Sequence, residues 1–431
     1  MSIQSQFSPE NEGLSALDQP PSTFHALEPA FLSDRVSGYF QHRVEGDWRG
    51  GHIMKGRRPG PNDLILSTND YLSLTDHPHI VEAQVRALRE NGRGILRSDV
   101  FRQGDDALRR FETELAALMG AEDVVTCQSG WNANVGLLQS IAGAETPVYI
   151  DMQAHTSLWE GILSAGATAR PFKHNDPASL DRMAARHGPG VVAVDAVYST
   201  SGEIAPLEAL ADAAARHGCV MVVDESHSLG VFGARGEGLT AQLGVSGRVH
   251  FRTASLSKAF ASRGGIVAGS ARNMEYFRFE SRPAIFSSGI LPQEAAGFLA
   301  TLRVIAEEGW RREALAENAE FLRARLAALD YNVEASQCQI VSLVAGAEAN
   351  TMVLRDALER HGIFGSVFCA PATAKNRSLI RFSVNSSLTR GELERIAAVC
   401  GAIRHEVGLY GWSSTKKRKS PAGEPALRQS A

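Results

Sequence analysis

The sequence predicts an α/β protein, with a large domain built on a mainly parallel sheet covered by helices and a smaller C-terminal α+β domain. Two observations lead to this prediction. Short runs that are apolar throughout recur between residues 124 and 223, and helical stretches separate them. Such strands are typical of parallel sheets whose two faces are both buried. From about residue 311 the pattern changes to a long charged helical segment, which indicates a second domain.

The predicted elements follow in order along the chain. Asp105 precedes apolar residues spaced by three and four, a pattern that predicts a capped amphipathic helix: Leu108, Phe111, Leu115 and Leu118. Strands of the large domain are predicted at residues 124–126, 148–150, 191–194 and 220–223, with a helix before the last. Strands of the smaller domain are predicted at residues 339–343 and 379–384, before a closing helix. In such sheets the ligand binds at the carboxyl ends of the strands.

The chain divides into four parts on this reading. Residues 1–60 form an N-terminal segment that begins with a mobile arm, residues 61–310 the large domain, residues 311–410 the small domain and residues 411–431 a disordered tail. The arm is rich in Ser, Pro, Gln and Glu, and the tail carries the basic run Lys416–Lys419. A basic run this short is most simply a solvated tail, so neither end is assigned a function.

Composition narrows the classes of function. A net charge of -4 gives no signal for binding nucleic acid. Five scattered cysteines without a CxxC pair disfavour disulfides and zinc, and we predict no metal site. The N-terminus lacks the order of a signal peptide, and no apolar run approaches the roughly 20 residues that cross a bilayer. We therefore expect a cytoplasmic protein, without membrane insertion, that acts on small molecules.

Two segments contain the residues that point most directly to a chemical function. Lys258 lies in TASLSKAF after a strand-like run, and Asp224 follows four apolar residues in VMVVDESHSLG. A lone lysine is usually a solvated surface group, and an aspartate at this place can simply cap a turn. Together they suit pyridoxal 5'-phosphate (PLP), because a carboxylate keeps the pyridine nitrogen of that cofactor protonated.

Two further segments support this reading. In CQSGWNAN, the residues Ser129, Gly130 and Trp131 follow a strand and open a helix, whose free amides can hold a phosphate together with Ser255. In DMQAHTSLWEG, His155 reaches the same sheet edge and can stack on the pyridine ring. A glycine turn alone is weak evidence, and a lone histidine is more often structural.

The order of the motifs SGWNAN, AHTS, FKHND, DESHSLG, SLSKAF, FSSG and LIRFSVN resembles the α-oxoamine synthase family, over about residues 60–405. This resemblance implies a fold-type I PLP-dependent transferase of the aspartate aminotransferase-like type. Relatives in that family include 8-amino-7-oxononanoate synthase, 2-amino-3-ketobutyrate CoA ligase, 5-aminolevulinate synthase and serine palmitoyltransferase. The strings LSTNDYLSL, PVYIDMQAHTSLWEG and GIFGSVFCAPATAKN are similar to the branch that makes α-hydroxyketone (cholera-type) quorum-sensing autoinducers.

The resemblance also implies residue roles. Lys258 matches the lysine that holds the cofactor, Asp224 the partner of the ring nitrogen, His227 the ligand of the ring hydroxyl and His155 the stacking histidine. The remaining matches are Ser199 near the ring oxygen, Ser255 at the phosphate, Arg381 at the substrate carboxylate, Asn69 near the substrate, and Ser288, which reaches the phosphate of a neighbouring subunit. The family therefore implies a homodimer with shared sites.

One segment departs from the family pattern. Where the oxononanoate-forming relatives carry glycines and serines, this chain reads GRGILRSDVFRQG, in which Ile95, Leu96 and Arg97 add bulk. This departure favours a pocket reshaped for a different amino substrate or acyl chain.

The resulting hypothesis is a PLP-dependent condensation of an acyl-CoA with an α-amino acid or S-adenosylmethionine. The amine of Lys258 removes the Cα proton, the substrate carbon attacks the thioester, CoA leaves, and decarboxylation gives an aminoketone or enaminone. A medium or long acyl chain such as decanoyl follows from the resemblance alone. Three alternatives stay open: a glycine-using oxononanoate synthase or ketobutyrate ligase, an aminotransferase, and a PLP-binding regulatory pseudoenzyme.

Overall fold

The structure is a computed structural model that describes residues 28–412 and residue 414. The predicted arm over residues 1 to about 25 and the basic run Lys416–Lys419 lie outside the described residues. The chain separates into two compact units, residues 1–55 and residues 56–431. The described part of the first unit contains helix α1 (Ala30–Gly38) and the π-helix η1 (Tyr39–Asp47).

The second unit contains a sheet of seven strands in the order β2-β8-β7-β6-β5-β3-β4. Five neighbouring strands, β7 to β4 in that order, run parallel, and β8 runs antiparallel to both β7 and β2. The strands are β2 (Asp123–Cys127), β3 (Pro147–Asp151), β4 (Thr168–Phe172), β5 (Val191–Asp195), β6 (Val220–Asp224), β7 (Phe251–Ser255) and β8 (Gly265–Gly269). The predicted mainly parallel sheet is confirmed, and so are its four predicted strands.

Helices pack on both faces of this sheet, as the apolar strands required. In β5, Val192 and Val194 belong to one hydrophobic cluster, whereas Val191 and Ala193 belong to a second cluster on the opposite face. The helices and short turns of this part are α2 (Pro78–Asn91), η2 (Asp99–Phe101), α3 (Ala107–Met119), α4 (Gly130–Ile141), α5 (Thr156–Ala165), α6 (Pro177–His187), α7 (Leu207–Arg216), α8 (Leu239–Gln242), η3 (Ser246–Arg248), α9 (Ala271–Glu280), α10 (Arg282–Ile285) and α11 (Pro292–Glu307).

The cap of helix α3 corrects the sequence prediction by one residue. The side chain of Asp106, and not that of Asp105, accepts a hydrogen bond from the amide of Arg109 at 2.9 Å. An N-cap side chain reaches the amide two or three positions on, and Asp106 has this spacing to the first turn. The amphipathic helix itself is confirmed.

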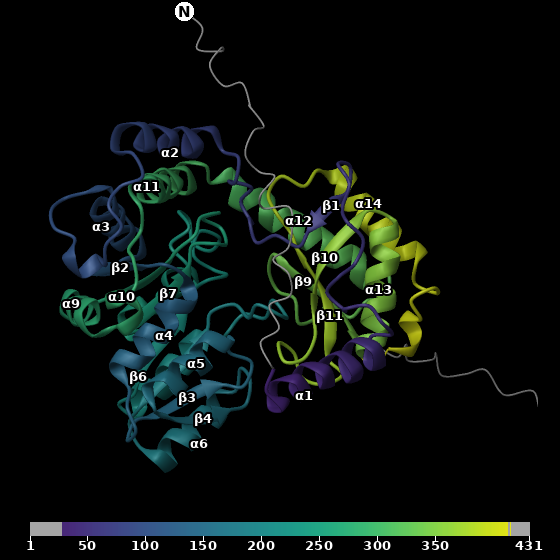
Figure 1. Cartoon of the computed structure of the whole chain (residues 1–431), viewed down its shortest axis with the longest axis horizontal. Helices are drawn as coiled ribbons and strands as arrows, with labels where there is room; N and C mark the ends of the chain where they lie inside the picture. Colours follow the sequence, from purple (N-terminus) through teal and green to yellow (C-terminus); the bar gives the residue numbers. More distant parts are fainter. Residues whose placement is uncertain (1–27, 413, 415–431) are drawn as a thin grey trace, which may run out of the picture. The chain divides into compact units, whose positions relative to one another are not determined.

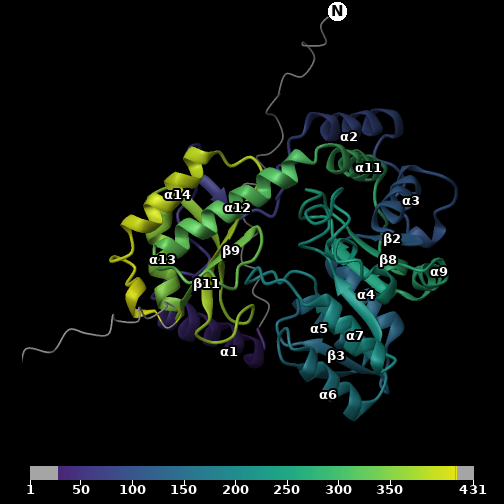
Figure 2. The ribbon, with the colours of Figure 1, turned by 180° about the vertical axis from the view of Figure 1, so that it is seen from behind.

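A second sheet in the same unit has four strands in the order β1-β10-β11-β9. They are β1 (Leu64–Leu66), β9 (Ile340–Gly346), β10 (Ile363–Phe368) and β11 (Ser378–Ser383), and the accompanying helices are α12 (Trp310–Ala328), α13 (Glu348–Arg360), α14 (Arg390–Ala402) and η4 (Leu409–Gly411). The two sheets form separate groups of strands in both ribbon views (Figure 1, Figure 2). Although β1 lies in the range predicted for the large domain, it pairs in parallel with β10. The domain boundaries themselves stay a prediction.

Two further features bear on the class of protein. The five cysteines all lie in the described residues, where each is a buried thiol and no disulfide joins any two of them. Among the described helices, none has the length and hydrophobicity that a bilayer-spanning helix needs.

Candidate active site

The predicted site residues gather at the carboxyl ends of the parallel strands. Ser129 follows β2, His155 follows β3, Ser199 follows β5, and Lys258 follows β7. Asp224 is the last residue of β6, and His227 lies in the turn after it. Parallel strands bring their carboxyl ends to one edge, which is why residues far apart in sequence meet here.

Asp224 is buried and held by hydrogen bonds from two directions. Its Oδ2 accepts from Asn134 Nδ2 at 2.7 Å, and its Oδ1 accepts from the amide of Ser226 at 2.8 Å. The Asn134 amide is itself fixed, because its Nδ2 also donates to Ser157 Oγ at 2.8 Å and its Oδ1 accepts from Thr253 Oγ1 at 2.6 Å. The carboxylate is therefore set in one orientation by Asn134 on α4 and by the turn after β6, and Asn134 is held in turn by Thr253 on β7.

His155 caps helix α5 and is fixed at its Nδ1 atom and its backbone. The Nδ1 atom lies 2.7 Å from Ser157 Oγ, and its backbone N–H donates to Asp195 Oδ2 at 2.9 Å. The indole ring of Trp131 lies edge-on to the imidazole, with ring centroids 6.2 Å apart. Burial lowers the pKa of His155, the charge of Asp224 opposes that shift, and Lys258 adds to it. The imidazole is thus favoured in its neutral form.

Lys258 is half-buried on the turn after β7, and its Nζ lies 3.5 Å from Ser257 Oγ. Burial lowers the pKa of this amine, the negative charge of Asp224 opposes the shift, and the positive charge of Arg381 adds to it. A lowered lysine pKa increases the fraction of uncharged amine, which is the form that acts as a nucleophile or base.

Ser129 and Ser255 lie at a close approach between the start of α4 and the end of β7. A Cβ atom on Gly130 would lie 2.6 Å from Ser255 Cβ, and one on Gly265 would lie 2.3 Å from the carbonyl carbon of Ser129, so only glycine fits at either place. Ser129 Oγ accepts from the amide of Asn132 at 3.1 Å as the helix cap. These serines and Ser257 line a cavity of about 660 Å³.

Ser288 lies near this cavity within the same chain. Its carbonyl oxygen accepts a hydrogen bond from the side chain of Gln128, the residue before Ser129. The role that the sequence implied for Ser288, at the phosphate of a neighbouring subunit, stays a prediction.

Arg381, on β11 of the smaller sheet, brings together three of the predicted residues. Its Nη1 donates to the carbonyl of Ser199 at 2.8 Å, and its Nη2 donates to Asn69 Oδ1 at 2.8 Å. The guanidinium lies over the ring of Phe368, 4.8 Å from the ring centroid. Its buried Nε atom has no hydrogen-bond partner among the described residues. A buried N–H without a partner is costly, so this atom is a ready donor for an anionic ligand.

His227 is fully enclosed beside this group. Its Nδ1 lies 2.7 Å from the hydroxyl of Tyr71, and its carbonyl accepts from Gln339 Nε2 at 2.8 Å. Burial lowers the pKa of His227 well below its ordinary value, and the positive charges of Lys258 and Arg381 act in the same direction.

Sequence reasoning missed several residues of this site. Tyr71 stood inside the motif LSTNDYLSL, from which only Asn69 was selected. Asn134 and Ser157 lie inside helices and belong to no recognisable spacing, although both fall in the quoted motifs SGWNAN and AHTS. Asp195 ends β5 as Asp224 ends β6, and that shared position was a signal that could have found it.

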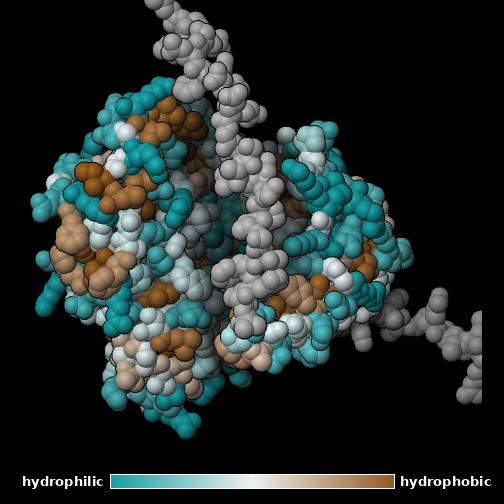
Figure 3. All heavy atoms as spheres, in the orientation of Figure 1, coloured by the Kyte–Doolittle hydropathy of each residue, from teal (hydrophilic) through white to brown (hydrophobic). Residues whose placement is uncertain are grey.

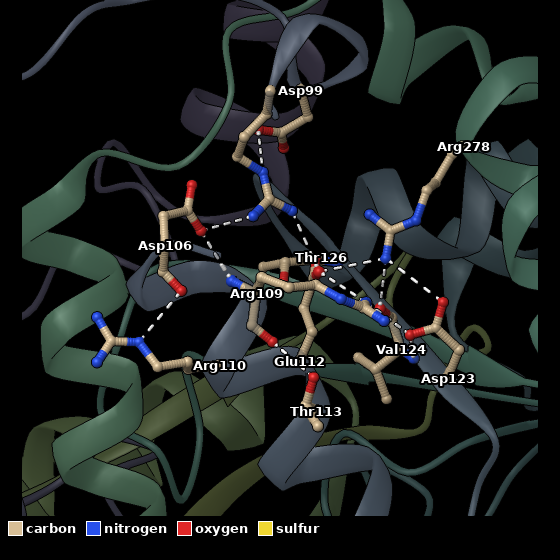
Figure 4. Close-up of polar contacts among 11 residues, drawn as sticks. Asp99, Asp106, Arg109, Arg110, Glu112, Thr113, Asp123, Val124, Thr126 and Arg278 are labelled. Atoms are coloured by element: carbon tan, nitrogen blue, oxygen red, sulfur yellow. Dashed lines mark hydrogen bonds and ion pairs between the residues drawn. The ribbon is translucent and has the colours of Figure 1, made fainter. Parts of the chain in front are cut away.

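The segment that departs from the family pattern is anchored by an ionic cluster (Figure 4). Glu112 on α3, with 1% of its surface exposed, lies at the centre of this cluster. Its Oε2 pairs with Arg102 at 3.1 Å, Arg278 at 3.2 Å and Arg109 at 3.4 Å, and its Oε1 accepts from the amide of Thr126 at 2.9 Å. The cluster therefore ties the segment before α3 to β2 and α9.

Comparison with known proteins agrees with this architecture. The family model described as aminotransferase class I and II matches residues 61–399. A CAI-1 autoinducer synthase of Vibrio campbellii is 43% identical over 372 residues, covering 86% of this chain and 94% of the relative. An 8-amino-7-oxononanoate synthase of Mycolicibacterium vanbaalenii is 32% identical over 371 residues, covering 85% of this chain and 95% of the relative.

A solved structure extends the likeness to three dimensions. The serine palmitoyltransferase of S. paucimobilis, with PLP and myriocin bound, superposes with a TM-score of 0.80 at 25% identity, covering 88% of this chain and 98% of that one. The fold-type I architecture predicted from the motifs is thereby confirmed. On these findings the chain belongs to the aminotransferase class I and II family, in its α-oxoamine synthase branch.

Proposed function

We propose that this protein is a PLP-dependent acyltransferase that condenses an acyl-CoA with an α-amino acid or S-adenosylmethionine, with release of CoA and CO₂. The observation that carries the proposal is that Lys258, whose pKa is lowered, lies at the same sheet edge as the buried carboxylate of Asp224. The likeness to the CAI-1 autoinducer synthase supports an aminoketone or enaminone product that leads to an α-hydroxyketone signal.

The residues present fit the cofactor at both ends. Gly130 and Gly265 leave room only for backbone beside Ser129 and Ser255, a cradle of amides and hydroxyls that suits a phosphate. Asp224 supplies the carboxylate that a protonated ring nitrogen needs. When bound there, PLP supplies an electron sink that stabilises negative charge at the substrate Cα.

The chain's own groups would then bind the amino substrate and move its proton. Arg381 offers an Nε–H that has no hydrogen-bond partner in the described part of the chain, and Asn69 lies beside the same guanidinium. The two would therefore hold the substrate carboxylate. The uncharged amine of Lys258 would take the Cα proton. His155, neutral and held at its Nδ1 atom by Ser157, would cover one face of the bound ring and keep the reacting carbon in place. His227 would hold the ring oxygen, and Ser199 would lie near it.

In the acyl transfer, one bond forms and one bond breaks at the carbonyl carbon of the thioester. The Cα of the amino substrate bonds to the thioester carbonyl carbon, the C–S bond breaks, and CoA leaves as the thiol. The carboxylate then leaves as CO₂, and a proton takes its place at Cα to give the aminoketone. With S-adenosylmethionine, an enaminone would form only if the sulfonium group also left as methylthioadenosine by elimination. We assign the acyl chain a medium or long length such as decanoyl, because the likeness to the autoinducer synthase points to it.

We infer a homodimer that forms through a hydrophobic face. Ile95, Leu96 and Phe101 before α3, together with Phe279 and Phe286 near α9 and α10, are between 60% and 81% exposed. Figure 3 shows hydrophobic residues gathered on this side of the molecule. Exposed apolar patches of this kind commonly mark protein interfaces. Ser288, two residues after Phe286, would then lie where it can reach the phosphate bound by the partner subunit. The five buried thiols support a reducing compartment, and we place the protein in the cytoplasm.

The likeness to 8-amino-7-oxononanoate synthase favours a second candidate, a related condensation with a different amino donor. Purified enzyme mixed with glycine, alanine, 2-aminobutyrate or S-adenosylmethionine and a panel of short and long acyl-CoAs, followed by mass spectrometry, separates the two. We expect CoA release and a decarboxylated product with a long acyl donor, and neither with Lys258→Ala. Turnover by Lys258→Ala would remove the lysine from the mechanism, and no CoA release with any donor would instead favour a regulatory pseudoenzyme.

A further inference from the structure

Tyr71 is a fully buried tyrosine that contacts both halves of the site. It follows strand β1, and its side chain has no exposed surface. The hydroxyl oxygen lies 2.7 Å from His227 Nδ1 and 3.3 Å from Asn69 Oδ1. Burial raises the pKa of Tyr71, so the hydroxyl favours its protonated form. A single proton is therefore shared between two neighbouring acceptors.

His227 carries a single ring proton as well. Burial and the positive charges of Lys258 and Arg381 all lower the pKa of His227, which favours the neutral imidazole. A neutral imidazole carries its proton on either Nδ1 or Nε2, and the other nitrogen accepts. The group that meets Nδ1 decides between these two tautomers.

The distances assign the Tyr71 proton to His227. Asn69 Oδ1 already accepts a hydrogen bond from Arg381 Nη2 at 2.8 Å, and its contact with the tyrosine is the longer one. The 2.7 Å contact with Nδ1 is at the most favourable length for an O–H donor. Tyr71 therefore donates to Nδ1, which leaves the ring proton of His227 on Nε2.

We propose that Tyr71 is a positioning residue that fixes His227 as the Nε2–H tautomer, so that His227 presents a donor, and not a lone pair, to the ring oxygen of the bound cofactor. The identity of the cofactor that accepts this hydrogen bond rests on the proposed function, whereas the tautomer of His227 does not. A neutral donor at this place stabilises the ionised ring oxygen without adding a charge beside Lys258. Asn69, by contrast, acts on Arg381 and not on the tautomer.

The tautomer is measurable in the protein without cofactor. Two-bond ¹⁵N–¹H correlation spectra of protein labelled with ¹⁵N-histidine distinguish the two forms, and His227→Gln assigns the resonance among the 13 histidines. We expect the Nε2–H pattern in the wild type and a mixture, or the Nδ1–H form, in Tyr71→Phe. Tyr331→Phe is the matched control, because that buried hydroxyl donates to the carbonyl of Cys400 at 3.0 Å instead. Asn69→Ala should keep the wild-type pattern.

A second readout follows the bound cofactor. The absorbance of PLP-loaded enzyme is titrated with pH, and we expect Tyr71→Phe to raise the midpoint by about one pH unit, because the ionised ring oxygen loses a fixed donor. We expect kcat to fall about tenfold while KM for acyl-CoA stays unchanged. Tyr331→Phe should leave the midpoint where it is.

Three results would overturn the proposal: an Nδ1–H pattern in the wild type, the wild-type pattern retained in Tyr71→Phe, or an equal change in Tyr331→Phe. The first of these does not need Tyr71→Phe, so the proposal is testable even if that variant does not fold. Failure of the enzyme to bind PLP would refute the proposed function alone, since the tautomer is read without cofactor.

Discussion

Asp195 and Asp224 lie directly opposite each other in register at the carboxyl ends of β5 and β6. Both side chains are buried, and they are 2% and 3% exposed. Burial raises the pKa of Asp195 well above its ordinary value, and the charge of Asp224 raises it further. Two adjacent buried carboxyls do not both ionise readily, so Asp195 favours its protonated form beside Asp224.

Asp195→Asn should therefore lower the stability of the fold only slightly, whereas Asp195→Ala should lower it more. The amide of asparagine still accepts from the backbone N–H of His155, but alanine leaves that buried donor unpaired at a cost of about 1–3 kcal/mol. Because the pKa of Asp195 is raised in the folded state, the stability it contributes is present at low pH and is lost as the pH rises through that pKa. Denaturant unfolding at a series of pH values should show that the free energy of unfolding of Asp195→Asn increases relative to that of the wild type as the pH rises. A constant difference would contradict this assignment.

His174 should stabilise the fold as a cation. Burial alone would lower its pKa, but hydrogen bonds to Asp151 and Glu203, at 2.8 and 3.0 Å, raise the pKa to about 9. His174→Gln should cost about 3–5 kcal/mol near pH 6, because it leaves Asp151 buried without a counter-ion. The raised pKa means that this stabilisation is complete below the ordinary histidine pKa and disappears as the pH rises through about 9.

Urea unfolding of His174→Gln at several pH values measures this effect. His217→Gln serves as the control, since His217 pairs at 3.1 Å with Asp181, whose side chain is 39% exposed. Exposed pairs contribute about 0–1 kcal/mol. A difference between His174→Gln and wild type that stays equal at pH 6 and pH 10 would argue for a neutral His174.

The cluster around Glu112 predicts a large loss of stability from a small change. Glu112→Gln removes the charge that balances Arg102, Arg109 and Arg278 and should cost about 3–5 kcal/mol in chemical unfolding. Glu114→Gln, on the same helix, breaks the exposed pair with Arg303 and should cost about 0–1 kcal/mol. Equal losses from the two variants would show that the buried cluster does not stabilise the segment before α3.

Arg381→Ala should raise KM for the amino substrate far more than KM for acyl-CoA. A charge-assisted hydrogen bond contributes about 1.5–3 kcal/mol, which corresponds to roughly 10- to 150-fold in affinity. Steady-state kinetics with each substrate varied in turn measures the split. Because the charge of Arg381 lowers the pKa of Lys258, the variant should also shift the acidic limb of the pH profile upward. Equal changes in both KM values would argue against a carboxylate role.

Much of the fold followed from the sequence because its strands are strong and uniform. Strands such as β5 and β6 are apolar along their length and could be found by inspection. By contrast, β4 contains Arg170 and Pro171, and β8 begins and ends on glycine, so neither resembles a buried strand. The three-residue strand β1 is too short to give a periodic signal, and only its pairing with β10 makes it a strand.

The residues of the candidate site also divide into those that the sequence reveals and those that only the folded chain reveals. Asp224 stands out because a charged residue directly after four apolar residues is unusual, and Lys258 because it lies in the segment TASLSKAF after a strand-like run. The motif order then assigned the rest. Other residues of the site are not visible in the sequence because they lie in helices or a loop, where they resemble ordinary polar residues. They are Asn134 and Ser157, which bond to each other beside Asp224, and Tyr71, which contacts His227. Glu112 resembles a surface residue of an amphipathic helix, and only the folded chain shows the three arginines around it.

Asn69 and Arg381 meet across 312 positions of sequence, and β1 pairs with β10 over a similar interval. The contact can form only after Arg381 has left the ribosome, so a growing chain is expected to complete this part of the candidate site late, after the local helices and hairpins have formed. A product that stops before residue 381 would thus lack the guanidinium that we propose holds the substrate carboxylate.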